Sequence, residues 1–292
     1  MISFGKSQGF AVVVAAAVIG AACSNSTSPG STGALTLAQG DTLSQVVTGD
    51  AQSDLDFATF SGAATVGPEA LRDNILTGPP ACVSRTPASP TNSDGDRVPD
   101  SVRITFNDCV VVYPLSSDTV RGSIDVLDPT PTVTDHAWKH VFNDLTRVHV
   151  GPAGRETIVD VNGSRQIIGD SAQLAFTSTN MSTTWQFPNG GTASHVRSWS
   201  LTFTADTAGS ILPDSALPSG SLTIAGNSTW TRGSNTWMVV VSTPSPLHYS
   251  AACTVRPKFD SGEIKAVVTR GSNTNNVTIQ FTACGTFTVT RS

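Results

Sequence analysis

The chain has 292 residues, of which 13% are charged and 38% are hydrophobic, and its formal net charge is −5. This length allows one large domain or two small ones. The acidic balance leaves no basic surface of the kind that binds nucleic acid, so nucleic acid is excluded as an expected partner.

Residues 1–22 have the pattern of an export signal. One basic residue, Lys6, precedes the apolar run FAVVVAAAVIGAA, which suits the core of a signal peptide and is too short to span a bilayer. The adjoining GAAC resembles the lipobox of bacterial lipoproteins, in which the cysteine is acylated and becomes the mature N-terminus. That resemblance implies lipidation of Cys23. Gly20 stands where the family usually has leucine, so cleavage after Ala22 by an ordinary signal peptidase is the alternative.

Residues 23–34 are predicted to form the lipidated cysteine and a flexible tether. The segment SNSTSPGSTGA is small and polar, and eleven such residues have a root-mean-square reach of roughly 18 Å. In the lipoproteins that the lipobox resembles, an aspartate after the cysteine retains the product at the inner membrane. Ser24 replaces it here, which implies an exported protein held by its lipid at the outer membrane or cell surface.

A single β-rich domain is predicted over 35–292, and it opens with one helix at about 36–58. Thr36 and Gln39 have the spacing of a capping box. Leu43, Val47 and Leu55 follow a helical period. We expect this helix to pack one apolar stripe on a sheet.

The stretch NSDGDRVPD is the most specific signal in the chain. Its alternating oxygen-bearing side chains suit a hard cation such as Ca²⁺. It resembles a calcium repeat of the thrombospondin type 3 kind, with asparagine in the first position, Arg97 where glycine is commoner, and no repetition. The expected function of the ion is structural, and a solvated acidic turn is the alternative. The expected ligands are Asn92, Asp94, Asp96, the carbonyl of Val98, and Asp100.

From Ser101 onward, strand patterns alternate with tight turns. Thr and Val recur at every second position, which is typical of half-buried antiparallel strands. Ten to twelve such segments predict an all-β fold, a large antiparallel meander sheet that is curled or barrel-like. Asn162-Gly163 predicts a hairpin turn, and FPNGGT at 187–192 predicts another.

Five cysteines in an exported chain leave one unpaired unless Cys23 is lipidated. The expected disulfides join sequence neighbours, Cys82 to Cys109 and Cys253 to Cys284, because consecutive strands tend to lie side by side. The segment from Cys253 to the C-terminus is similar to the ending of many uncharacterised bacterial lipoproteins. That resemblance implies a secreted β-rich domain and supplies no active site.

Other candidate sites have weaker support. His136 and His140, with His149, could ligate zinc, but two ordinary strand histidines explain the spacing better. Ser171 follows Gly-Asp as in SGNH-type esterases and lacks their α/β context. Trp185 and Phe187 flank the PNGG turn, where an exposed ring could stack on a sugar; packing in the core is the commoner use of such rings.

The expected function is therefore a surface-anchored lipoprotein with a structural or ligand-binding role, without an evident catalytic site and with a glycan or envelope component as a possible partner. One alternative is a hydrolase of envelope glycans or polymers that uses acidic residues such as Asp125, Asp128 or Asp160. Another is a lipid carrier with a half-barrel cavity, which requires a deep apolar concavity.

Overall fold

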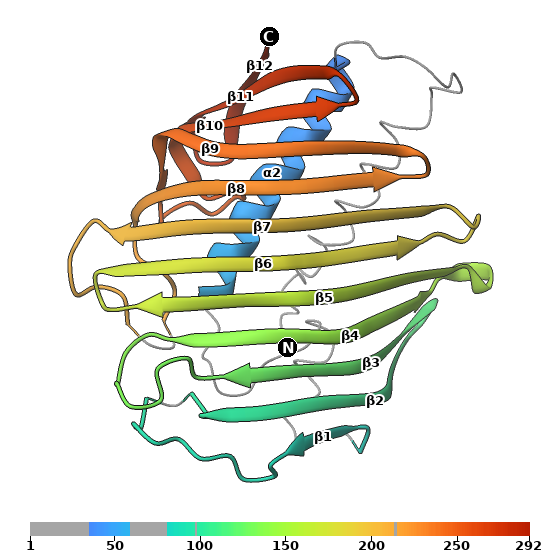
Figure 1. Ribbon diagram of the computed structural model, residues 1–292, viewed down its shortest axis with the longest axis vertical. Coiled ribbons are helices and arrows are strands. Elements are labelled where there is room, and N and C mark those ends of the chain that lie inside the picture. Colours follow the sequence, from blue (N-terminus) through green and yellow to red (C-terminus); the bar gives the residue numbers. More distant parts are fainter. Residues whose placement is uncertain (1–34, 59–80, 97, 213–214) are drawn as a thin grey trace, which may run out of the picture.

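The structure is a computed structural model that describes residues 35–58, 81–96, 98–212 and 215–292. In this part of the chain, 12 strands form one antiparallel sheet in the order β1 to β12, so each strand pairs with its neighbours in the sequence. The sheet does not close on itself, and it curls around α2, which is the one long helix among the described residues (Figure 1). The prediction of an all-β meander with one N-terminal helix is confirmed.

The strands and helices have the following bounds. They are α2 (Leu37–Ala58), β1 (Val83–Thr86), β2 (Ser101–Tyr113), β3 (Ser116–Leu127), β4 (Trp138–Val150), the 3₁₀ turn η1 (Pro152–Gly154), β5 (Glu156–Gly169), β6 (Gln173–Gln186), β7 (Thr192–Ala205), β8 (Gly220–Arg232), β9 (Asn235–Tyr249), β10 (Phe259–Arg270), β11 (Asn273–Ala283) and β12 (Thr286–Arg291).

The start of α2 is fixed by the predicted capping box. The Gln39 amide donates to the Thr36 hydroxyl at 3.2 Å, and the Thr36 amide donates to the Gln39 side-chain carbonyl at 2.9 Å. These two bonds satisfy amide groups that have no partner within the helix. A Cβ on Gly40 would lie 2.7 Å from the Arg291 side chain of β12. Glycine therefore lets the last strand approach the first turn of the helix.

The helix crosses one face of the sheet diagonally, and we call this the inner face (Figure 1). Strand alternation assigns residues to it: along β7 the buried positions are every second residue from His195 to Ala205. Trp199 and Phe203, which are 1% and 0% exposed, lie in the core with Val47 and Leu55 of the helix. The inner face thus holds the main apolar core, as period-2 patterning requires.

A series of β-bulges interrupts the pairing within the strands. Register shifts fall between Phe106 and Cys109, between Phe142 and Leu145, and between Ser178 and Met181. Each bulge contains a residue with a positive φ, namely Asp108, Asp144 or Asn180. Because a bulge adds a residue on one strand and bends it, the series accounts for the curl of the sheet.

The expected hairpin at Asn162-Gly163 was wrong, because both residues lie inside β5. Gly163 has φ of +110°, and a Cβ there would lie 2.4 Å from the Asn180 carbonyl oxygen on β6. Glycine is needed at this position because the bulge of β6 at Asn180 approaches the backbone of β5 closely. The Asn162 side chain accepts a hydrogen bond from the Asp144 amide at 2.8 Å. The positive φ of Gly163, which would suit a hairpin turn, instead accommodates the bulge of the neighbouring strand.

The other sequence-local features are present. The turn at FPNGGT joins β6 to β7, with the Phe187 amide donating to the Gly191 carbonyl at 2.9 Å. Both expected disulfides form, Cys82 with Cys109 and Cys253 with Cys284, across sequence separations of 27 and 31. In the chain-entropy treatment each closed loop contributes roughly 3.5 kcal/mol.

Candidate ligand groove and acidic cluster

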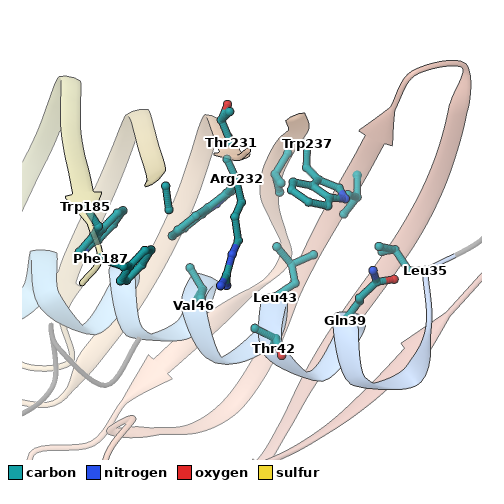
Figure 2. Close-up of a pocket in the computed structure, with 14 residues that line it drawn as sticks. Leu35, Gln39, Thr42, Leu43, Val46, Trp185, Phe187, Thr231, Arg232 and Trp237 are labelled. Atoms are coloured by element: carbon teal, nitrogen blue, oxygen red, sulfur yellow. The ribbon is translucent and has the colours of Figure 1, made fainter. Parts of the chain in front are cut away.

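An apolar groove lies between the first turns of α2 and the hairpin ends of β6 to β10 (Figure 2). The helix contributes one stripe of side chains, and the strands contribute aromatic rings and small apolar groups. Among the described residues, Arg232 is the only charged side chain that lines it. The lining residues are Leu35, Gln39, Thr42, Leu43, Val46, Trp185, Phe187, Ala193, Trp230, Thr231, Arg232, Trp237, Val239 and Val268.

The aromatic side chains of the groove are ordered by stacking. The rings of Trp185 and Trp230 are parallel within 11° at 6.4 Å, and the His195 ring stacks on Trp230 at 3.6 Å. The Arg232 guanidinium lies 5.7 Å from the centre of the Phe187 ring. Figure 2 shows the Arg232 side chain pointing from β8 toward the helix. Such fixed rings present a preformed surface, which is typical of small-molecule sites.

The two residues singled out for ligand stacking, Trp185 and Phe187, therefore both line this groove. Trp185 is only 6% exposed, so its ring forms part of the groove wall and does not offer a solvent-exposed face for stacking. Phe187 is half-buried beside the turn. The sequence placed them at the turn, whereas the contribution of Arg232, Trp230 and the helix depends on the tertiary fold.

A polar hollow adjoins the groove at the hairpin tips. Phe187, Arg232 and Trp237 line both hollows, and the remaining groups are amides, glycines and a threonine. The Asn189 side-chain oxygen accepts from the Gly191 amide at 3.0 Å, and the Asn235 oxygen accepts from Arg270. The Arg270 guanidinium also lies 5.2 Å from the Trp237 ring centre. The lining residues of the polar hollow are Phe187, Asn189, Gly191, Thr192, Arg232, Gly233, Asn235 and Trp237.

A buried ion network lies deeper on the inner face, under the middle of α2. Arg197 of β7 donates to Asp54 at 2.7 Å and lies 3.5 Å from Asp50. Arg165 of β5 lies 3.9 Å from Asp54. Burial alone would lower the pKa of Arg197, but the two carboxylates raise it, so it stays charged. Burial, followed by the Arg197 charge, lowers the pKa of His195 well below its usual value, so that imidazole is neutral.

The predicted calcium loop contributes to an acidic cluster of Asp94, Asp96 and Asp128. One carboxylate oxygen from each lies within 4.8 Å of the others. Asp128, which follows β3, is 6% exposed. Each of the three has a buried Oδ2 atom without a hydrogen-bond partner in the part of the chain that the structure describes. Burial, together with repulsion from Asp94 and Asp128, raises the pKa of Asp96 to about 6 against the bond from the Val98 amide.

The remaining residues of the expected calcium set are placed differently. Asp100 accepts hydrogen bonds from the Ser93 amide and hydroxyl and from the Thr91 hydroxyl, and these bonds lower its pKa. The Asn92 side chain accepts from the Gly95 amide at 2.7 Å. Asp100 and Asn92 therefore form hydrogen bonds within the loop itself. The third member of the acidic cluster, beside Asp94 and Asp96, is Asp128. The side chain of Val98 is buried in the apolar core.

The candidate zinc and esterase residues are dispersed. His140 is buried against Phe57 at 4.8 Å between ring centres, and burial lowers its pKa to about 3. The His149 side chain forms a hydrogen bond with the Asp118 carboxylate at 2.9 Å. His136 lies between β3 and β4, and its backbone amide donates to the carbonyl of Gly169, the last residue of β5. Within the described residues no metal-ligand group includes these histidines. Ser171 lies in the short connection between β5 and β6.

The three carboxylates considered for a hydrolase each interact with a different set of partners. Asp125 pairs with Arg103 at 2.6 Å and accepts from Asn143, and these partners lower its pKa despite some burial. Asp160 accepts from the Thr146 hydroxyl at 2.6 Å. Asp128 belongs to the acidic cluster.

One charged arrangement was not foreseen from the sequence. His248 lies between two carboxylates, 2.7 Å from Asp260 and 3.0 Å from Asp206. The hydrogen bond to Asp206, then that to Asp260, raises the pKa of His248 against its partial burial. Asp206 follows β7, His248 lies in β9 and Asp260 in β10, and no local sequence pattern links them.

Comparison of the chain with protein-family models, with curated proteins and with solved structures finds no match. Among the described residues, no helix is both long and apolar enough to cross a membrane. The expected signal peptide, Cys23 and the tether lie outside the described residues.

Proposed function

We propose that this protein is an exported, lipid-anchored envelope protein that binds a ligand in the groove and catalyses no reaction. The observation that carries the binding role is the groove itself, whose walls are apolar side chains of α2, the stacked rings of Trp185 and Trp230, and the Trp237 ring of β9. A concave, mostly apolar site with a few polar groups at one end is the usual form of a small-molecule pocket.

The anchoring half of the proposal depends on GAAC at residues 20–23 and on the cysteine count. With two disulfides formed by the other four cysteines, Cys23 is the one left for another use. Mass spectrometry of the mature N-terminus should show a diacylglycerol-modified cysteine. Cys23→Ser should move the protein from the membrane fraction to the soluble fraction, and a variant that stays membrane-bound would refute the anchor.

The binding half is tested with a neutral fluorescent apolar probe, N-phenyl-1-naphthylamine, and the full chain carrying Cys23→Ser. Ala193 lines the groove, so Ala193→Trp should fill it and abolish the enhancement of probe fluorescence. Ala175→Trp is the matched control, because Ala175 is an exposed residue of β6. Equal melting temperatures would show that both variants fold. Equal probe binding by the two variants would refute the groove as a ligand site.

We also propose that the acidic cluster binds one structural Ca²⁺ through Asp94, Asp96 and Asp128. Ca–O distances of about 2.3–2.6 Å place oxygens that share one ion up to about 5 Å apart, which suits the observed 4.8 Å limit. The specific support is the buried Oδ2 of Asp128, which lacks a partner among the described residues. The ion would join the loop inside the first disulfide to the end of β3. Isothermal titration with CaCl₂ tests this, and Asp128→Asn should abolish the heat of binding.

A further inference from the structure

The last residues of β2 form an edge of the sheet that β1 does not cover. β1 pairs with β2 only as far as Phe106, and the Asn107 amide then donates to the Cys82 carbonyl at 2.8 Å. Beyond that bond, no strand in the described ranges pairs with the side of β2 that faces away from β3 (Figure 1). We call residues 108–113 of β2 the open edge. We infer that the open edge pairs with the same edge of a second copy of this chain, antiparallel and centred on Val111.

The backbone of the open edge requires an extended chain as its partner. From Cys109 to Tyr113, β2 pairs with β3 on its other side. Every second residue of an antiparallel strand directs its N–H and C=O groups away from that partner. The open edge therefore presents a row of donors and acceptors, and another strand is the partner that satisfies such a row in order.

The side chains of the open edge require an apolar partner. Val110 and Val112 point away from the inner face and are 59% and 77% exposed, and Leu115 of the adjoining turn is 76% exposed. The sequence has no charged residue from Cys109 to Tyr113. Lysine and proline commonly protect such edges from pairing, and neither is present in this stretch. The open edge thus favours a strand of uncharged, apolar residues.

The open edge is itself such a strand, and it is complementary to its own copy. A twofold axis perpendicular to the joined sheet places one residue opposite its copy, and Val111 is the middle residue of Cys109–Tyr113. Val110 then lies opposite the partner's Val112, and Val112 opposite the partner's Val110. Cross-strand pairs of such apolar residues stabilise antiparallel sheets.

The same register separates the charges and keeps β1 clear of the second copy. Asp108 would lie opposite the partner's Pro114, so the two Asp108 carboxylates stay at opposite ends of the interface. Phe106, the last residue that pairs with β1, would face a position beyond the partner's hairpin tip. Each β1 therefore remains beside its own β2, and the two open edges meet along the stretch that β1 leaves uncovered.

The open edge is held in place by an ion pair on the adjoining strands. Asp118 of β3 pairs in register with Val111. Its carboxylate accepts two hydrogen bonds from Arg147 of β4, at 3.0 and 2.8 Å, and its side chain is 3% exposed. A strand that is already ordered loses little conformational freedom when it associates.

The edge at the other end of the sheet is a poorer partner. The exposed side chains of β12 are Thr286, Thr288 and Thr290, and Arg291 lies against Gly40 of the helix. Pairing of β2 with β12 of another copy would also be head-to-tail, and it would continue into an open chain of molecules. Pairing of two β2 edges closes after two copies.

Sedimentation velocity of the full chain carrying Cys23→Ser, over a series of concentrations, tests the dimer. One short edge makes a small interface, which belongs to the weak class, so we expect a monomer–dimer equilibrium. Val112→Lys should weaken dimerisation by at least about tenfold, because a charge enters the apolar pairing. Val133→Lys is the matched control, since Val133 is 54% exposed in the β3–β4 connection, and it should dimerise like the parent.

Equal melting temperatures would show that both lysine variants fold. A parent protein that stays monomeric throughout the series would overturn the inference, and so would a dimer that Val112→Lys leaves unchanged. Species that grow beyond the dimer as concentration rises would indicate head-to-tail pairing and would also overturn it.

Cysteine cross-linking tests the register. Val110→Cys and Val112→Cys, mixed and mildly oxidised, should form a disulfide between copies, because directly opposite Cβ atoms lie about 4.5–5.5 Å apart. Each variant alone should cross-link poorly, since its cysteines would be diagonal neighbours about 7–8 Å apart, too far for a disulfide. Self-cross-linking as efficient as that of the mixture would refute pairing about Val111.

Amide hydrogen exchange distinguishes a second copy from other occupants of the open edge. Exchange at Val110 and Val112 should slow as the protein concentration rises, and Val112→Lys should abolish this dependence. Protection that is complete in the monomer and independent of concentration would assign the open edge to a strand of the same chain. That result would overturn the pairing of two copies.

Discussion

Two groups of carboxylates are buried in this molecule, and they differ in how their charge is balanced. Asp50 and Asp54 of α2 lie against Arg197 and Arg165 on the inner face of the sheet. The acidic cluster has no ion pair with Lys or Arg in the described ranges, although Asp128 is as buried as Arg197, both being 6% exposed. The first group is neutralised by folding alone. The second group repels itself unless protons or a cation from outside neutralise it.

The largest expected effect comes from unbalancing the first group. Arg197→Met should leave Asp54 buried without its main partner and lower the free energy of unfolding by about 3–5 kcal/mol. Urea denaturation checks this, with Arg155→Met as a control that should change stability by less than about 0.5 kcal/mol.

Adding Asp54→Leu to Arg197→Met tests whether charge imbalance is the cause. The double variant should recover at least about 2 kcal/mol, because an apolar replacement of a buried pair is often neutral. A double variant no more stable than Arg197→Met alone would show that packing, and not charge, sets the cost.

Neutralising the second group should have a smaller effect. Ca²⁺ at ten times its dissociation constant should stabilise the wild type by about 1.4 kcal/mol, which is roughly 3–5 °C in melting temperature. Asp128→Asn removes one repelling charge and one ligand, so it should raise stability in EDTA and lose the response to Ca²⁺. A wild-type melting curve indifferent to millimolar Ca²⁺ would refute the site.

Protons should neutralise the acidic cluster as well, with a still smaller effect. The pKa of Asp96 is raised to about 6 in the folded state, so the folded protein binds more protons than the unfolded chain between pH 4 and 6. Stability from this group therefore rises as pH falls through that window. Because the group is partly solvated, the gain should stay below about 1 kcal/mol. Without Ca²⁺, Asp96→Asn should flatten the wild-type slope over pH 4–6, and a slope unchanged by the substitution would contradict the assignment.

In a third group of carboxylates, Asp206 and Asp260, the balancing cation is His248, which itself titrates. The folded-state pKa of His248 is raised by Asp206 and Asp260, so its contribution is present below the unfolded pKa of about 6.5 and is lost as pH rises through the folded value. His248→Gln should cost roughly 0.5 kcal/mol at pH 6 and nothing at pH 9. Equal costs at both pH values would indicate a role in packing instead.

Local patterns predicted the elements of the fold because each is formed by neighbours in the sequence. Thr36 and Gln39 cap the helix that their spacing indicates, and each of the four paired cysteines bonds to its neighbour in the order of cysteines along the chain. Asn162-Gly163 shows the limit of this reasoning. A positive φ at Gly163 is compatible with either a hairpin or a bulge, and only the approach of Asn180 from the next strand decides between them.

The candidate sites were less predictable because distant residues complete them. Asp94 and Asp96 were recognisable from their spacing, whereas Asp128 joins them from the end of β3. Likewise Trp185 and Phe187 were visible beside their turn, but Arg232 comes from β8 and the opposite wall of the groove from α2. Without the path of the helix across the sheet, no sequence pattern connects these groups.

The strictly sequential strand order has a consequence for how the chain acquires its structure. Every hairpin can form as soon as its second strand is available, since each strand pairs with its sequence neighbours. The helix is different, because the Leu35 amide bonds to Asn275 across a separation of 240 residues and Arg291 lies on Gly40. A chain that emerges from its N-terminus would therefore expose α2 first and seat the helix's first turns last, after β11 and β12 have arrived. Until then the rings of β6, β8 and β9 would face solvent, and this interval is when the chain would most need protection from aggregation.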